Sequence, residues 1–186
     1  MNRKTAILHA GMDLLKVKGL AALTQPQVAK AAGLTQSHLT YYFPTRDALL
    51  LSIAEFSVDT ILSELNERLT VKPARQTLAS EVIRNILDGL PPRVILGLIV
   101  ASDSDPAIRE ALQRLISHVR DRIRMLLKKS GLACDYEAAL LFHATIVGLA
   151  VMHQARQSPI SGREIELGIR AIIGKLAHSV ESHAGD

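Results

Sequence analysis

Residues 25–44 read QPQVAKAAGLTQSHLTYYFP, and this stretch predicts a helix, a tight turn and a second helix. The hydroxyl of Thr24 can cap the first helix, and Pro26 suits a first turn because its missing N–H has no partner there. Gly33 is the residue type most able to adopt the left-handed conformation that ends a helix. Thr35 can then cap the second helix. The pattern is typical of a helix-turn-helix.

The second helix is expected to carry a polar outer face without any acidic residue. Leu39 should point inward, which leaves Gln36, Ser37, His38 and Tyr41 outside. An acid would be repelled by DNA phosphates, whereas amides and hydroxyls can hydrogen-bond to base edges in the major groove. The face therefore indicates DNA binding. An ordinary αα-hairpin with a polar outer face is the alternative.

The positive charge of the chain lies in the same segment. Residues 1–50 hold six of the 22 Lys and Arg residues but only two of the 18 acids, so the rest of the chain is formally neutral. A basic head on a neutral body is what a protein that binds a polyanion needs.

Residues 5–50 resemble the DNA-binding domain of the tetracycline-repressor (TetR) family. The residues that carry this resemblance are Thr24, Val28, Ala29, Ala32, Gly33, Leu34, Thr35, Leu39, Phe43, Arg46, Leu49 and Leu50. Thr40 stands where the family usually has Tyr, Tyr42 where it usually has His, and Arg46 replaces a Lys. The resemblance implies a helix-turn-helix DNA-binding domain over residues 1–46 and a helical ligand-binding and dimerisation domain over residues 47–186.

The outer face and the resemblance together define the expected DNA contacts. We expect base edges to be read by Gln36, Ser37, His38 and Tyr41, and the DNA backbone to be held by Thr24, Gln25, Lys30, Thr35, Thr40, Tyr42 and Arg46.

The remainder of the chain has helical periodicity throughout, so we predict an all-α fold of about nine helices. A long helix should begin at Thr45, and a last helix near Arg163. Residues 138–155 contain no Lys, Arg, Asp or Glu. Their length is marginal for a membrane span, and we interpret them as a buried helix of a bundle or a dimer interface. The helix after Pro106 has a basic face, which we interpret as solvated and paired with local acids; contact with nucleic acid is the alternative.

The resemblance also implies a homodimer formed through the last two helices, and a small-molecule effector bound in the body. Candidate ligand-binding residues lie on apolar helices that include polar or flexible side chains, although plain core packing is an alternative for each: Ile95, Leu98, Met125, Phe142, His143, Val147 and Met152.

The sequence contains no grouping that marks an enzyme, a metal site or a cofactor site. It lacks a Gly-rich phosphate loop, a Gly-x-Ser-x-Gly turn and a helical two-His-plus-Glu motif. A single cysteine fits a reducing cytoplasm. We therefore expect a cytoplasmic, ligand-responsive transcriptional regulator, most simply a repressor that a small molecule releases from a pseudo-palindromic operator. A helical protein–protein adaptor and an enzyme are the alternatives.

Overall fold

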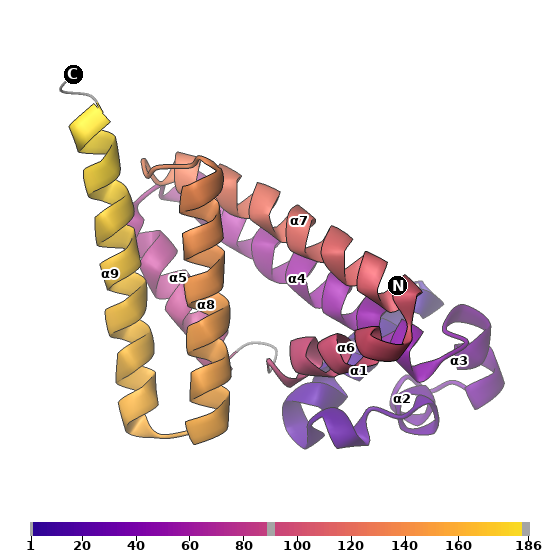
Figure 1. Ribbon diagram of the computed structural model, residues 1–186. Coiled ribbons are helices and arrows are strands. Elements are labelled where there is room, and N and C mark those ends of the chain that lie inside the picture. Colours follow the sequence, from indigo (N-terminus) through magenta and orange to yellow (C-terminus); the bar gives the residue numbers. More distant parts are fainter. Residues whose placement is uncertain (1, 89–91, 184–186) are drawn as a thin grey trace. The chain divides into compact units, whose positions relative to one another are not determined.

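The computed structural model describes residues 2–88 and 92–183, and within them the chain forms nine α-helices and one short 3-10 helix (Figure 1). Their bounds are α1 Arg3–Lys18, η1 Leu20–Ala22, α2 Gln25–Ala31, α3 Gln36–Tyr42, α4 Arg46–Val71, α5 Arg75–Asp88, α6 Arg93–Ser104, α7 Pro106–Lys129, α8 Tyr136–Arg156 and α9 Pro159–His183. The described residues contain no strand, and the prediction of an all-α fold of about nine helices is confirmed.

Short side chains cap the helices at their first residues. Asn2 Oδ1 accepts the N–H of Lys4 at 2.9 Å, and Thr45 Oγ1 accepts that of Ala48 at 3.0 Å. Asp135 Oδ1 does the same for α8, with 2.8 Å to the nitrogen of Ala138. Each cap satisfies a backbone donor that has no partner inside the helix. The long helix therefore begins at the residue after Thr45, as its capping residue predicts.

The described residues divide into two compact units. The first contains residues 2–59 and 92–115, and the second contains residues 60–88 and 116–183. The predicted DNA-binding segment thus shares its unit with the first half of α4, with α6 and with the first part of α7. A head of about 45 residues is near the lower limit for independent folding, so it needs this additional core.

The core of the first unit is built around α1 and the first half of α4. Ile7, Leu23 and Ile53 are completely buried there. Gly11 lets α1 and α4 approach closely, because a side chain at this position would overlap the end of Ile53 unless Ile53 shifted. In the same unit, a methyl group at Gly97 of α6 would lie 3.0 Å from the side chain of Leu20, so this glycine lets α6 approach η1 closely.

In the second unit, α8 and α9 lie antiparallel and side by side, and α5 packs against both (Figure 1). Phe142 of α8 and Ile165 and Ile169 of α9 are buried in this contact. A methyl group at Gly168 would lie 2.8 Å from Leu149 Cδ1. The absence of a side chain at this glycine therefore lets the two helices approach closely.

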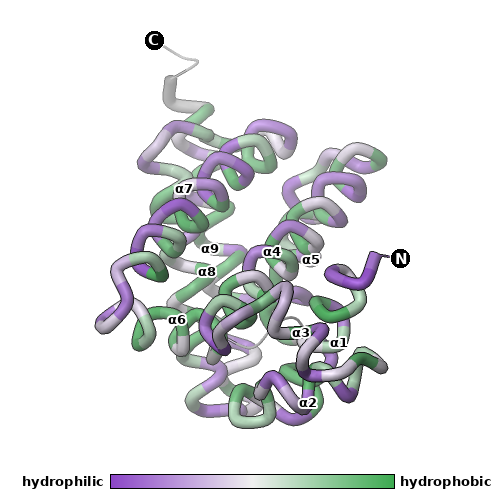
Figure 2. The backbone as a smooth tube through the Cα atoms, turned by 90° about the vertical axis from the view of Figure 1, so that its right-hand side faces the viewer, coloured by the Kyte–Doolittle hydropathy of each residue, from purple (hydrophilic) through white to green (hydrophobic). Residues whose placement is uncertain are grey.

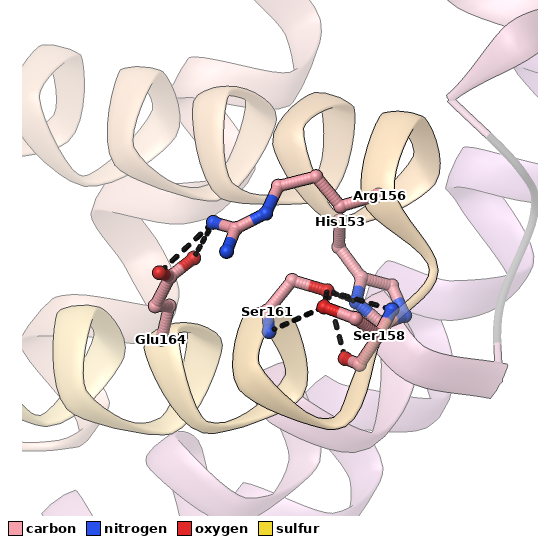
Figure 3. A network of polar contacts seen from close by, with 5 residues as sticks. All are labelled: His153, Arg156, Ser158, Ser161 and Glu164. Atoms are coloured by element: carbon pink, nitrogen blue, oxygen red, sulfur yellow. Dashed lines mark hydrogen bonds and ion pairs between the residues drawn. The ribbon is translucent and has the colours of Figure 1, made fainter.

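A polar network joins the end of α8 to the start of α9 (Figure 3). His153 Nδ1 lies 2.8 Å from Ser161 Oγ, and Ser161 Oγ donates to the carbonyl of Ser158 at 2.9 Å. Arg156 and Glu164 form an ion pair at 2.6 Å beside them. Helix α9 begins at Pro159, earlier than the expected start near Arg163, because a proline at the first helical position gives up no hydrogen bond.

Helices α7 and α8 differ in how much of their apolar surface the chain itself covers. Hydrophobic and hydrophilic residues alternate turn by turn along α7 (Figure 2), and its apolar stripe is buried. Helix α8 is long and apolar enough to cross a membrane by length and composition, yet only 17% of its most apolar stretch is buried within the chain. Within the single chain α8 is therefore not enclosed by a bundle, and the other part of the interpretation, a dimer interface, stays a prediction.

Candidate functional site

The helix-turn-helix has the frame that its sequence predicts. Thr24 Oγ1 accepts the N–H of Gln27 at 3.4 Å, and Thr35 Oγ1 accepts that of His38 at 3.3 Å. Gly33 has φ of 68° between the two helices, in the left-handed region that favours glycine. This turn is closed by a bond from the N–H of Leu34 to the carbonyl of Ala29 at 2.9 Å. The two short helices are therefore fixed at both ends of their turn.

One face of α3 is buried, and the opposite face is open to solvent. Leu39 has no exposed surface, and Ala29 of α2 is 2% exposed. Gln36, Ser37 and His38 are exposed, and the described residues make no hydrogen bond to their side chains. Tyr41 is 82% exposed, and its ring meets that of Tyr42 edge-on at 5.2 Å between centroids. The candidate base-reading side chains therefore share one accessible surface, which we call the α3 face.

Two of the candidate backbone contacts hold the domain itself together. Gln25 Nε2 donates to the carbonyl of Phe43 at 2.7 Å, which joins the start of α2 to the end of α3. Arg46 Nε donates to the carbonyl of Leu23 at 3.0 Å and its Nη2 to that of Leu20 at 3.3 Å. The nearest of these partners is 18 residues away along the chain. No local sequence signal could have indicated these bonds.

The other residues predicted to contact the DNA backbone differ in whether their side chains still have a free hydrogen-bond donor. Thr24 and Thr35 use their hydroxyl oxygens as acceptors in the caps, so their O–H groups are still able to donate to a phosphate. The hydroxyl of Thr40 instead donates to the carbonyls of Gln36 and Ser37, at 3.0 and 3.1 Å. Lys30 is exposed and Tyr42 is half-buried.

The excess positive charge of the head lies at its surface. All six Lys and Arg residues of the segment 1–50 are exposed: Arg3, Lys4, Lys16, Lys18, Lys30 and Arg46. Charges in water attract a polyanion over roughly 8 Å at physiological ionic strength. The segment that carries the α3 face therefore also carries the charge needed to draw DNA towards it.

The candidate ligand-binding residues have unequal environments and belong to both units. Leu98 and Phe142 are core residues, 0% and 2% exposed. Met125, Val147 and Met152 are 52%, 38% and 51% exposed, while Ile95 and His143 are half-buried. Ile95 and Leu98 belong to the first unit, and the other candidates belong to the second: Met125, Phe142, His143, Val147 and Met152.

The basic face of α7 is bonded more specifically than the sequence suggests. Arg114 pairs with Glu110 of the same helix, as expected. Arg124 Nε instead donates to the carbonyl of Cys134 at 3.1 Å, and Lys129 Nζ to the amide oxygen of Asn66 at 2.6 Å. Arg120 Nη1 donates to the hydroxyl of Tyr136 at 3.2 Å, but its buried Nε has no partner.

His143 of α8 lies close to Arg120. Burial lowers the pKa of the His143 imidazole below its ordinary value, and the positive charge of Arg120 lowers this pKa further. The imidazole is therefore neutral at pH 7. Arg120 was not among the residues predicted to bind a ligand, although a signal exists: no acid stands three or four positions from it along α7.

Within residues 2–88 and 92–183, no three His, Cys, Asp or Glu side chains are grouped in a way that could hold a metal ion. No cofactor was predicted, and the residues of the α3 face carry no group that would require one.

The sequence and the fold of this chain are similar to those of known transcriptional regulators. Residues 7–53 match the family described as "Bacterial regulatory proteins, tetR family". The chain is similar to the HTH-type transcriptional regulator CymR of Pseudomonas putida, with 29% identity over 164 residues that cover 81% of this chain and 79% of that protein.

Two solved structures have the same fold at low sequence identity. A transcriptional regulator of Rhodococcus sp. RHA1 superposes with a TM-score of 0.73 at 14% identity, covering 93% of this chain and 94% of that one. A regulator of Saccharomonospora viridis, solved in complex with choline, gives a TM-score of 0.67 at 17% identity, covering 92% and 95%.

Proposed function

Because this chain belongs to the TetR family of DNA-binding transcriptional regulators, we propose that it binds a pseudo-palindromic operator through the α3 face. The single observation that carries this assignment is the exposed set of Gln36, Ser37, His38 and Tyr41 on a capped, buried helix. Amide, hydroxyl and imidazole groups without an acid suit base edges in the major groove. Thr24, Lys30, Thr35, Thr40 and Tyr42 contact the DNA backbone. Gln25 and Arg46 were also expected to do so, and they act mainly by positioning the helices through their internal bonds.

The operator-bound form is a homodimer assembled through α8 and α9. Both helices expose large apolar side chains besides the ligand candidates: Leu141, Ile160, Leu167 and Val180. A side chain added at Gly148 would meet nothing within 4 Å inside the chain, so α8 leaves room for a close partner. A two-fold dimer presents two copies of α3 to two half-sites of one operator.

The body, residues 47–186, binds a small-molecule effector, and the DNA-binding domain is residues 1–46. Within the second unit, His143, Met125, Val147 and Met152 are accessible enough to contact a ligand, and Phe142 would support it from the core of that unit. Ile95 and Leu98, the other two candidates, belong to the first unit. The relative that was solved with choline supports the general idea that this fold accommodates a small organic molecule. An effector that shifts α4 would change how the two heads meet the operator and release the repressor.

The curated relative is a regulator of transcription, and neither the adaptor nor the enzyme alternative is favoured. A transcriptional regulator acts where the DNA is, so we place the protein in the cytoplasm, with the apolar surface of α8 covered by a partner subunit and not by lipid.

The test is binding of the purified protein to DNA fragments flanking its own gene, compared with scrambled DNA at two salt concentrations. We expect specific binding that persists at the higher salt, because base contacts add to the phosphate contacts that salt weakens. Equal binding to both DNAs that disappears at higher salt would contradict the assignment of the α3 face.

A further inference from the structure

The guanidinium of Arg120 is hydrogen-bonded at one end and has a buried, unpaired donor at the other. Its Nη1 donates to the Tyr136 hydroxyl at 3.2 Å, and its Cζ lies 5.9 Å from the centre of the Tyr136 ring. Its Nε, on the opposite edge of the group, is buried and has no hydrogen-bond partner. Leaving a buried donor of a charged group without a partner is costly, so such an atom indicates that a partner is missing.

The neighbouring arginines of α7 do not share this feature. Arg124, one turn further on, places its Nε 3.1 Å from the Cys134 carbonyl oxygen. Arg114, in the other direction, is neutralised by Glu110. Within the described part of the chain, no acid forms an ion pair with Arg120. The positive charge of Arg120 is therefore left without a counter-charge in a half-buried position.

His143 adds a hydrogen-bonding group without adding charge. It lies about two helical turns after Tyr136 on α8, so both side chains are on the same face of that helix. Burial, assisted by the charge of Arg120, lowers the pKa of His143. The neutral imidazole can donate one hydrogen bond next to the guanidinium.

We propose that Arg120, Tyr136 and His143 bind the carboxylate group of a small organic acid with an apolar body. This inference rests on the proposed function, because the organic acid is then the effector of the regulator. A carboxylate suits the site because its two oxygens match the Nε and Nη2 donors along one edge of a guanidinium. A phosphate dianion would leave one negative charge uncompensated in a half-buried position, which is unfavourable.

The apolar body is inferred from the residues that flank the polar groups. Ile123 follows Arg120 by one turn and is 3% exposed, and Phe142 precedes His143 and is 2% exposed. Val147 follows His143 by one turn and is 38% exposed, so it is available to contact a ligand. An acid with a hydrocarbon body would bury apolar surface against this side of α8.

The experiment is calorimetric titration of the full-length protein with octanoate and benzoate, each compared with its uncharged amide. We expect wild-type protein to bind at least one acid about tenfold more tightly than its amide, since a hydrogen bond to a charged group is worth about that much. Arg120→Gln should remove the preference for the acid. Arg124→Gln is the matched control, because it removes the same charge and one bond from α7 to the segment before α8, and it should keep the preference.

Two further measurements separate binding geometry from charge and from folding. Arg120→Lys keeps the charge but loses the planar edge, and we expect it to weaken acid binding by several-fold. In NMR spectra, a bound carboxylate should raise the pKa of His143 by offsetting the repulsion from Arg120. Thermal unfolding of each variant shows whether it is folded.

The inference is overturned if wild-type protein does not distinguish either acid from its amide, or if Arg124→Gln loses the preference as fully as Arg120→Gln does. Operator binding by the same preparations is measured without ligand. Operator binding that is retained without a preference for acids would refute this inference alone, whereas loss of specific operator binding would refute the proposed function.

Discussion

The Nε atom of Arg46 lies 3.0 Å from the carbonyl oxygen of Leu23, so the first residue of α4 is hydrogen-bonded to the residue that precedes the helix-turn-helix. A second bond reaches Leu20 of η1, against which Gly97 of α6 packs. The segment 20–23 is thus the place in the first unit where α1, α4 and α6 meet the DNA-binding helices. Movement of α4 would be transmitted to the head through these bonds.

This relationship predicts that Arg46 acts more by positioning than by contacting phosphate. Arg46→Ala should reduce stability by about 0.5–1 kcal/mol, because two partly exposed hydrogen bonds are lost. Operator affinity should fall while the slope of log affinity against log salt stays the same, since a lost phosphate contact would reduce that slope by about 1. Binding at four salt concentrations measures both. A reduced slope would show that Arg46 contacts the DNA backbone directly.

The α3 face should determine operator specificity. Gln36→Ala and Tyr41→Ala should each weaken specific binding by about 1–3 kcal/mol, the range for the loss of a base contact. Both side chains are exposed, so thermal unfolding should not change. Gln76→Ala, at an exposed glutamine of α5, is the control and should leave binding intact. An equal loss of affinity for scrambled DNA would mean that these residues touch only the backbone.

The dimer should depend on the apolar surface of α9. Leu167 is 69% exposed in the single chain, and Leu167→Glu should convert the dimer to a monomer because it places a charge in an apolar interface. Light scattering at micromolar concentration reports the mass. Leu87→Glu, at a 42% exposed leucine of α5, should remain dimeric. A wild-type protein that is monomeric, or a dimer that tolerates Leu167→Glu, would exclude this interface.

The link between α4 and α5 should make stability depend on pH in acid. Glu81 accepts hydrogen bonds from Arg68 and Arg84, each at 2.7 Å. Burial raises the pKa of Glu81, but the hydrogen bonds and charges of Arg84 and Arg68 outweigh it, so the net pKa lies below the ordinary value. The contribution of a carboxylate with a lowered pKa is present above its unfolded pKa and is lost as pH falls through the folded pKa.

Glu81→Gln should therefore destabilise the protein by about 1 kcal/mol at pH 7, a modest value because the two arginines are about half exposed. The difference from wild type should be constant above about pH 5 and shrink towards zero as pH falls below about 4.5. Urea unfolding across this range measures the difference. Glu64→Gln, at an exposed glutamate of α4, is the control. A difference that stays constant down to pH 3 would show that the ion pairs do not contribute.

The local features of the DNA-binding segment could be predicted from the sequence, because each depends on residues within one turn. Thr24 and Thr35 cap the helices as predicted, Gly33 takes the left-handed turn, and Leu39 points into the core. A cap, a positive φ and an amphipathic stripe are properties of neighbouring residues and their side-chain chemistry. The resemblance to the TetR family rests on the same short-range pattern.

Hydrogen-bond partners that lie far apart along the chain could not be predicted from these short-range patterns. Gln and Arg are residue types that often contact DNA. The side chains of Gln25 and Arg46 nevertheless donate hydrogen bonds to carbonyls 18 and 23 residues away along the chain. The basic face of α7 is uniform in sequence, and only the folded chain separates Arg124, whose Nε has a carbonyl partner in the segment before α8, from Arg120, whose Nε has none.

The sequence by itself determined the class of fold, the helix ends of the DNA-binding segment and the acid-free face of α3, because helix caps, turn glycines and hydrophobic periodicity act over three or four residues. Only the tertiary structure decided which polar side chains bond within the protein and which remain open to DNA, to a ligand or to a second subunit. The reason is that a hydrogen bond forms wherever donor and acceptor are brought within about 3 Å, and folding brings them together from distant parts of the chain.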